Sequence, residues 1–326
     1  METLGRIDST IWLQNLWRNR VQSALLLAAM GAFLALLGWL VWGPDGVLML
    51  VAVGVLGVAM NPRVSPWWVM RLYGARPISP QQAPNLWSLA GRLTARADLQ
   101  NTPDLYYVPS SMLNAFAVGT RQQAAIAVTD GLLRKLTLRE IAGVLAHEIS
   151  HVRNNDLWVM GLADLFSRAT NLLSLVGQFL LVMNVPLMLL GQTAISWPAI
   201  LLLILAPNLS ALGQLALSRT REYDADLNAA RLTGDPEGLA RALAKIESEQ
   251  GGWLERIFMP GRRIPDPSLL RTHPRTDRRI ARLLALRPLP AGFDWELLAR
   301  PTSDIASTFG RPVVRLPGWH ISGLWH

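Results

Sequence analysis

Long stretches without a charged residue constrain the fold of this chain more than any other feature. Residues 21–42 carry no charge over 22 positions, enough for a helix to cross the roughly 30 Å hydrocarbon core of a bilayer. Residues 172–190 and 195–217 are two further uncharged runs joined by a short link, which predicts a membrane hairpin. Residues 47–60 are apolar over only 14 positions, a length that also suits a buried or interfacial helix. We interpret this run as a second span, so that four transmembrane helices are predicted.

The composition supports the same class of protein. Hydrophobic residues make up 51% of the 326 residues and charged residues only 17%, against about 25% charged in soluble domains. The formal net charge of +8 comes from scattered arginines without a nucleic-acid motif, so we expect no nucleic acid partner. There is no cysteine, which excludes disulfides and thiolate zinc sites. Any zinc would therefore be held by His and carboxylate groups, as in catalytic sites.

The distribution of Lys and Arg predicts the orientation of the spans. Arginines follow or precede the outer ends of the apolar runs, whereas the two hairpin turns, 43–46 and 191–194, hold no Lys or Arg. Positively charged loops stay in the cytoplasm, so both termini and the segment between the hairpins are expected on that side. The first run is too long for the apolar core of a signal peptide and lacks a clear cleavage site, which favours a membrane anchor.

Residues 63–156 have the character of a soluble domain. Residues 84–97 are predicted to form a helix, and residues 105–108 and 124–129 to form short strands, with an edge strand at 114–118 between them. Thr137 followed by Glu140 is a capping box ahead of an apolar run, which predicts that a helix starts there. Beyond the second hairpin, helices are expected from Asp235-Pro236 to about residue 250 and over 274–286.

The predicted helix after Thr137 contains the most informative motif of the chain. His147, Glu148 and His151 form the H-E-x-x-H pattern of zinc-dependent proteases. Residues four apart lie one turn apart on a helix, so both imidazoles can reach one metal ion. Glu148 would then lie beside the metal, where it can take a proton from a water that the metal activates. The chain has only five His, so chance is a poor explanation for the pattern.

A catalytic zinc needs a third protein ligand. The candidates are His273, His320, His326 and the acidic pairs of the second half of the chain. Glu222 is the best placed, because it follows the last apolar run on what is expected to be the same helix. Asp226 lies one turn further on the same face, where it can hydrogen-bond to a ligand histidine from behind.

Five segments together resemble a known family, namely the HtpX-type membrane metalloproteases, whose superfamily also holds the CAAX prenyl proteases. The segments are 114–119, 129–133, 147–151, 218–226 and His273-Pro274. The resemblance runs from the first span to about residue 286. It implies a mainly α membrane protein with four transmembrane helices and a gluzincin-like α+β zinc protease domain containing a small β-sheet.

The resemblance also implies roles for individual residues. Glu222 would be the third ligand of one zinc ion per chain, beside His147 and His151, with Asp226 behind them. Glu148 would be the catalytic base, and His273 a candidate for stabilising the transition state. The substrate would bind as an added strand along the predicted edge strand, which consists of Asn114, Ala115, Phe116, Ala117 and Val118.

These expectations define a domain organisation. An N-terminal membrane hairpin (1–62) would be followed by a first catalytic part with the zinc helix (63–168), a second hairpin (169–217), a second catalytic part (218–286) and a tail (287–326). The expected protein is a multi-pass endopeptidase of a bacterial-type plasma (inner) membrane, with its active site in the cytoplasm. It would cleave misfolded or membrane proteins in quality control and the stress response. Its partners would be protein or peptide substrates and the bilayer, with homo-oligomers or membrane protease partners as further candidates.

Two alternatives remain open. A dedicated prenyl-peptide-type processing protease would use the same chemistry on a narrow substrate, but that family has more membrane spans than this chain offers. A non-hydrolytic, metal-binding membrane scaffold or chaperone would need no base beside the metal, and the presence of Glu148 weighs against it.

Overall fold

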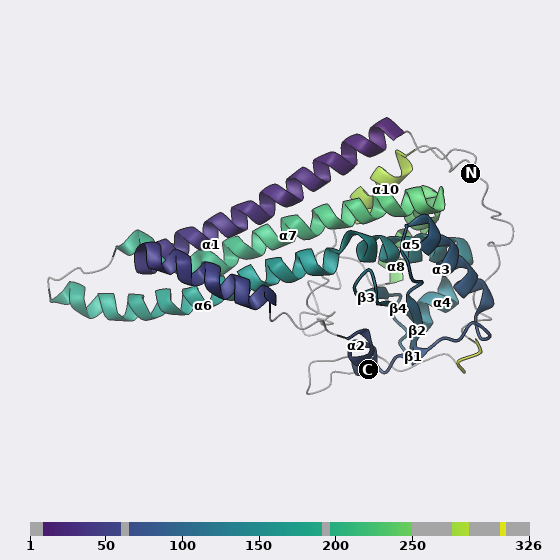
Figure 1. Ribbon diagram of the computed structural model, residues 1–326, viewed down its shortest axis with the longest axis horizontal. Coiled ribbons are helices and arrows are strands. Elements are labelled where there is room, and N and C mark those ends of the chain that lie inside the picture. Colours follow the sequence, from purple (N-terminus) through teal and green to yellow (C-terminus); the bar gives the residue numbers. More distant parts are fainter. Residues whose placement is uncertain (1–8, 60–64, 191–195, 250–275, 287–306, 311–326) are drawn as a thin grey trace. The chain divides into compact units, whose positions relative to one another are not determined.

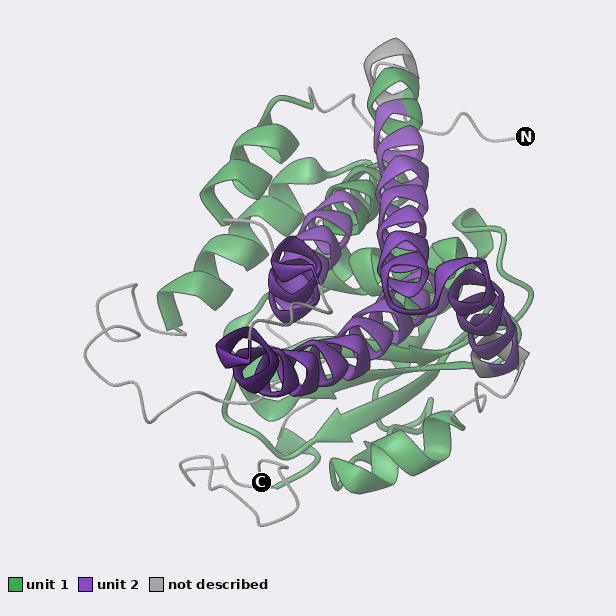
Figure 2. Cartoon of the chain, turned by 90° about the vertical axis from the view of Figure 1, so that its left-hand side faces the viewer, with its two compact units in different colours: residues 1–17, 63–157, 221–326 green, residues 18–62, 158–220 purple. Residues whose placement is uncertain are grey.

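The structure is a computed structural model that describes residues 9–59, 65–190, 196–249, 276–286 and 307–310. These residues are mainly helical, with a small mixed β-sheet (Figure 1). The chain divides into two compact units (Figure 2). One consists of residues 1–17, 63–157 and 221–326, and the other of residues 18–62 and 158–220. The domain boundaries expected from the sequence stay predictions.

Three helices within the described residues are long and apolar enough to cross a membrane, judged by length and composition. They are α1 (Ser9–Ala59), α6 (Asp156–Leu189) and α7 (Trp197–Thr233). Helices α6 and α7 extend well beyond the uncharged runs. Asp164 and Arg168 form an ion pair at 2.7 Å one turn apart on α6, and such a pair stabilises the part of the helix that precedes the uncharged run. The segment 191–194 lies outside the described residues.

Helix α1 is broken where the sequence predicts a turn. Trp42 and Gly43 leave the helical region, and Gly43 takes a positive φ of 63°, which glycine adopts without strain. Pro44 then starts the second half of α1, which folds back along the first (Figure 1). A Cβ on Gly46 would lie 2.2 Å from the carbonyl oxygen of Gly38, so the halves meet through these two glycines. The number of membrane crossings, four in the prediction, stays a prediction.

The sheet of the other unit has the strand order β1-β2-β4-β3. Its strands are β1 (Arg76–Pro77), β2 (Asp104–Val108), β3 (Ala115–Gly119) and β4 (Ala124–Thr129). Strands β2 and β4 are parallel, whereas β1 and β3 each pair antiparallel with their neighbours. The three strands predicted from the sequence are confirmed to within one residue at each end, and β3 is indeed an edge strand.

Helices cover both faces of the sheet because its side chains alternate. On β4, Ile126 and Val128 belong to the main core, while Ala125 and Ala127 belong to a second cluster on the other face. The main core packs against α3 (Pro84–Arg96) and α5 (Leu138–Asn154). The second cluster packs against the short helix α2 (Pro66–Leu72).

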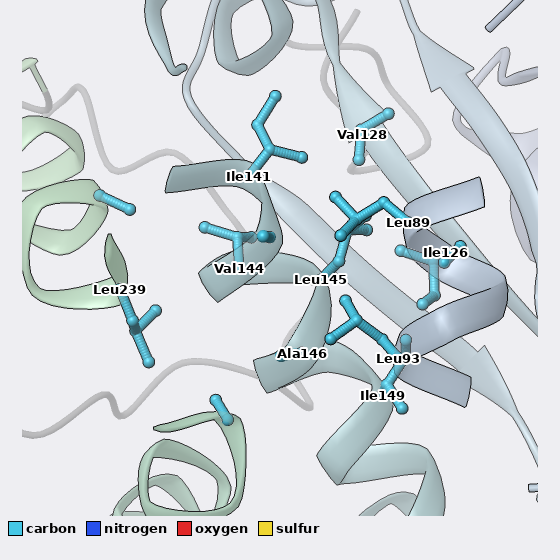
Figure 3. Close-up of a cluster of buried hydrophobic side chains, with 14 of the residues drawn as sticks. Leu89, Leu93, Ile126, Val128, Ile141, Val144, Leu145, Ala146, Ile149 and Leu239 are labelled. Carbon is cyan, nitrogen blue, oxygen red and sulfur yellow. The ribbon is translucent and has the colours of Figure 1, made fainter. Parts of the chain in front are cut away.

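Helix α5 lies between Leu239 of a later helix on one side and the side chains of α3 and β4 on the other (Figure 3). Its residues Ile141, Leu145 and Ile149 are fully buried in the core that α3 and the sheet share. On its other side it contacts α8 (Pro236–Glu249), where a Cβ on Gly143 would lie 2.7 Å from the Cα of Leu239. Helix α10 (Thr276–Leu284) packs on α8 in turn. This packing on two sides holds α5 and its histidines in place. The remaining short helix, α4, spans Asp130–Lys135.

Candidate metal centre

The start of α5 sets the position of its histidines. The Thr137 hydroxyl accepts from the backbone N–H of Glu140, and the Glu140 carboxylate accepts from the backbone N–H of Thr137. The predicted capping box is therefore confirmed. His147 and His151 then lie one turn apart, with ring centroids 4.7 Å apart and ring planes perpendicular. Their Nε2 atoms face each other at 3.1 Å.

Glu222, on α7, brings a carboxylate to these two nitrogens. Its Oε2 lies 3.5 Å from Nε2 of His147, and its Oε1 lies 3.5 Å from Nε2 of His151. One ligand atom from each of the three residues lies within 4.8 Å of the others, which makes them a group that could hold a metal ion. Two ligands about 2.05 Å from a tetrahedral zinc are about 3.3 Å apart. The separations of 3.1 and 3.5 Å fit such an ion.

A second carboxylate lies behind each histidine. Oδ1 of Asp226 lies 3.1 Å from Nδ1 of His147, in the position predicted for this residue. Oδ2 of Asp156 lies 2.7 Å from Nδ1 of His151. The other oxygen of Asp156 accepts from the Arg221 guanidinium, with Nε at 2.7 Å and Nη2 at 2.6 Å. Each imidazole is thus oriented so that Nε2 points toward the candidate metal position.

Asp156 was missed from the sequence because its placement depends on a sharp bend. Asn155 ends α5 in the left-handed conformation, with φ 54° and ψ 37°, and Asp156 begins α6 directly afterwards. Asn tolerates this conformation better than most residues. The bend turns the first residue of α6 back toward His151, five residues earlier in the chain. An acidic residue soon after the second histidine and just before an apolar run is the signal that could have revealed it.

Burial and the carboxylates act in opposite directions on the two imidazoles. Burial lowers the pKa of His151, but its hydrogen bonds with Asp156 and Glu222 outweigh this and raise the pKa well above the usual value. Burial lowers the pKa of His147 as well, but the nearby carboxylates of Asp226 and Glu222 outweigh this and raise the pKa. The site therefore attracts positive charge, which a metal ion can supply in place of protons.

Arg279, on α10, is a second residue missed from the sequence. Its side chain is only 4% exposed, and it donates to both oxygens of Asp226, from Nε at 2.8 Å and from Nη2 at 2.7 Å. Its Nη1 lies 3.1 Å from Oε2 of Glu222. Burial lowers the pKa of Arg279, but the charges of Asp226 and Glu222 outweigh this and raise it. The guanidinium therefore stays charged and holds both carboxylates beside the histidines.

Glu148 points from α5 toward the edge strand of the sheet. Its Oε2 accepts a hydrogen bond from the backbone N–H of Ala117, at 3.0 Å. Glu148 therefore follows the first histidine in the sequence, and its side chain contacts the edge strand.

The remaining predicted site residues lie along β3 or outside the described residues. Asn114 precedes β3, and its backbone N–H donates to the Thr129 hydroxyl at 3.0 Å. Phe116 is buried against α2 on the other face of the sheet, and Ala115 and Val118 are partly buried. His273, the predicted transition-state donor, lies outside the described residues, and its role stays a prediction.

Comparison with known proteins identifies relatives over most of the chain. The sequence pattern described as Peptidase family M48 matches residues 80–287. A Protease HtpX homolog from Desulfatibacillum aliphaticivorans is 35% identical over 319 residues, which cover 89% of this chain and 98% of that protein. Another, from Acaryochloris marina (strain MBIC 11017), is 38% identical over 292 residues, which cover 82% of this chain and 94% of that protein.

A structural similarity is weaker. The crystal structure of S. mikatae Ste24p overlaps with 83% of this chain and 66% of its own, at 21% identity and a TM-score of 0.40, too low to inform the function. The family pattern covers well over half of the chain, and the relatives align over nearly their full lengths. The chain therefore belongs to peptidase family M48, in which it is a membrane metalloprotease of the HtpX type.

Proposed function

We propose that the chain is a zinc-dependent endopeptidase that cleaves misfolded or membrane proteins on the cytoplasmic side of the membrane, in quality control. His147, His151 and Glu222 would hold one zinc ion, and Asp226 would orient His147. The observation that carries this proposal is the spacing of the three ligand groups, 3.1 and 3.5 Å, which suits a tetrahedral ion bound by nitrogen and oxygen.

The bound ion would polarise the scissile carbonyl and acidify a water molecule. The residues of the chain supply the remaining chemistry. Glu148 would accept a proton at Oε2, the oxygen that now accepts from the Ala117 N–H, and later deliver it to the leaving amine. With the ion bound, His151 would keep its proton on Nδ1, because Oδ2 of Asp156 lies 2.7 Å away, and would present an unprotonated Nε2.

The edge strand β3 would bind the substrate as an additional strand. Main-chain hydrogen bonds along an edge give affinity with modest sequence preference, which suits a protease that acts on many unfolded chains. The Ala117 N–H points to Glu148 rather than to β4, so this edge of the strand faces the candidate site. A substrate strand here would bring its peptide bonds beside the catalytic base.

The membrane topology forms a separate part of the proposal. We expect α1 to cross the membrane twice, which with α6 and α7 gives four crossings and leaves both termini in the cytoplasm. The lack of Lys and Arg in the two hairpin turns supports this orientation. Reporter fusions after Asp45 and Gln192 should read as exported, and a fusion after Gln250 as cytoplasmic. An exported signal after Gln250 would overturn the model of four crossings.

Zinc analysis paired with a proteolysis assay tests the proposed chemistry on the detergent-purified protein. We expect one zinc per chain and cleavage of casein that a chelator abolishes and zinc restores. Glu222→Ala should lose zinc, whereas Glu247→Ala, a matched change of an exposed glutamate on α8, should keep it. Stoichiometric zinc with unchanged affinity in Glu222→Ala would show that the third ligand lies elsewhere. Zinc binding without any turnover by the wild-type protein would favour the scaffold alternative.

A further inference from the structure

Helix α2 exposes most of its large apolar side chains to solvent. Met70 is 1% exposed and packs in the cluster under the sheet, whereas Trp67, Trp68 and Leu72 are 51, 58 and 52% exposed. With 3.6 residues per turn, these three and Arg71 occupy one contiguous face of about 140°. Exposing such a face to water is unfavourable. Large apolar areas that stay exposed on a folded protein therefore usually mark a contact surface.

The chemistry of this face suits the boundary between lipid and water. The rings of Trp67 and Trp68 meet edge to face at 5.1 Å, and the Arg71 guanidinium lies 5.2 Å from the centre of the Trp67 ring. Trp is enriched at the headgroup level of membrane proteins, because its ring is apolar and its indole N–H can still reach polar groups. Arg can lie along such a face and extend its charge to the headgroups.

The sequence around α2 favours an anionic membrane surface over a protein partner. Residues 46–97 contain five Arg and no Asp or Glu. A positively charged segment of this kind is attracted to the anionic lipids of a cytoplasmic leaflet. Only six residues, 60–65, separate the end of α1 from the start of α2. At up to about 3.6 Å per residue, this linker keeps Pro66 within about 25 Å of Ala59, the end of a helix long enough to span a bilayer.

We propose that α2 lies in the interfacial region of the bilayer, with Trp67, Trp68 and Leu72 inserted at the headgroup level and Arg71 directed toward lipid phosphates. The bilayer is the occupant of this face. The position of α2 in the bilayer does not depend on the zinc chemistry or on the peptidase activity, whereas its consequence for substrates rests on the proposed function.

The position of α2 would hold the substrate-binding edge at the membrane surface. Met70 shares a buried cluster with Phe116 of β3, and the ring of Tyr73, which follows α2, lies 5.0 Å from the Phe116 ring. A Cβ on Gly119 would lie 2.9 Å from Cγ of Pro66. Helix α2 therefore packs directly on β3, the strand whose Ala117 N–H contacts Glu148. Anchoring α2 would favour substrates whose extended segments emerge beside the bilayer.

The absence of cysteine from the sequence makes a direct test simple, since one introduced cysteine can carry a spin label. Leu72→Cys keeps both tryptophans and would be labelled in vesicles of phosphatidylcholine with a minority of phosphatidylglycerol. Collisions with oxygen, which concentrates in lipid, and with a water-soluble nickel chelate give the depth of the label. Leu201→Cys, on the apolar part of α7 and 58% exposed, and Glu247→Cys, exposed on α8, are the lipid and water references.

We expect the label at position 72 to favour oxygen over the nickel chelate, with a ratio between those of the two references. The label in a Trp68→Cys variant should give the same ordering. A ratio at position 72 equal to that at position 247 would overturn the proposal, because α2 would then lie in water. Low collision rates with both reagents would also overturn it, since that result indicates that another protein surface covers α2.

A second variant tests the two tryptophans. Trp67→Ser with Trp68→Ser, made in the Leu72→Cys background, should raise the collision rate with the nickel chelate at least twofold as the helix leaves the lipid. The melting temperature should change little, because both side chains are more than half exposed. An unchanged depth of the label in this variant would contradict the role of the tryptophans as anchors.

Discussion

His151 and Asp156 form a 2.7 Å contact between Nδ1 and Oδ2 across the bend between α5 and α6. Asp156 is the first residue of a helix apolar enough to span a membrane, and its second oxygen is held by Arg221 on another such helix. The orientation of a candidate metal ligand therefore depends on a buried ion pair between the first residue of α6 and a residue of α7. Removing either partner should weaken metal binding as well as the stability of the fold.

Asp156→Asn should weaken zinc binding by about 10–100-fold, the usual effect of losing a carboxylate behind a ligand histidine. The neutral amide cannot balance the positive charge of Arg221 as the carboxylate does. Its NH2 group would face either His151 or Arg221. Zinc affinity is measured by competition with a chelator, and the Co²⁺-substituted protein gives an absorption spectrum that reports ligand geometry.

Asp130→Asn is the matched control for this change. Asp130 is 2% exposed and also pairs with an arginine, Arg134 at 2.8 Å, but it belongs to α4 and not to the metal site. We expect this variant to lose stability with zinc affinity unchanged. Equal zinc affinities for wild type and Asp156→Asn would show that Asp156 does not position His151.

Arg279→Met should destabilise the metal-free protein more than the zinc-bound protein. The change leaves Asp226 and Glu222 buried without the guanidinium, and losing one partner of a buried ion pair costs about 3–5 kcal/mol. A bound divalent cation offsets part of that charge. Melting temperatures with and without zinc should therefore differ more for the variant than for wild type. An equal fall in melting temperature with and without zinc would mean that Arg279 does not compensate the negative charge of the metal site.

Alkaline pH should destabilise the protein through Tyr107. Burial and the hydrogen bond with Asp130 raise the pKa of Tyr107 above the usual value for a tyrosine, to about 12, so the folded state favours the neutral phenol. The resulting stability is fully present below pH 10 and is lost as the pH rises toward 12. A shift of this size corresponds to roughly 2–3 kcal/mol.

Tyr107→Phe isolates this contribution. The variant should lose the 3.0 Å hydrogen bond to Asp130 but keep the stacking on Phe309, whose ring centre lies 4.2 Å away. Its melting temperature should therefore fall less than that of wild type between pH 10 and pH 12. Parallel curves for the two proteins over this range would contradict the raised pKa.

Local chemistry was predictable from the sequence, whereas contacts between distant segments were not. The capping box of Thr137 and Glu140, the edge strand and the one-turn spacing of His147 and His151 follow from short patterns. The place of Glu222 beside the two histidines was expected because of the resemblance to a known family. Arg279 contacts Asp226 across 53 residues of chain, and no periodicity encodes such a pairing. The parallel pairing of β2 with β4 likewise depends on how the main core packs under α5.

Short helices and bends were also hard to predict. Helix α2 has only seven residues and exposes Trp67 and Trp68, whereas a helix that packs on a core usually buries its largest apolar side chains. The left-handed Asn155 is a single residue whose conformation redirects the chain toward the next helix. Both features depend on their surroundings, the sheet for α2 and the start of α6 for Asn155.

The most direct test of the account is the activity of Glu148→Gln, with zinc content and melting temperature measured on the same preparation. The amide keeps the shape of the side chain but cannot accept the proton, and general-base catalysis contributes about 10²–10⁴-fold. Casein cleavage should therefore fall at least about a hundredfold, while zinc content and melting temperature stay near wild type because the three proposed ligands are unchanged. A variant that cleaves casein at nearly the wild-type rate would contradict the mechanism, and one that loses zinc and stability together would make Glu148 a structural residue instead.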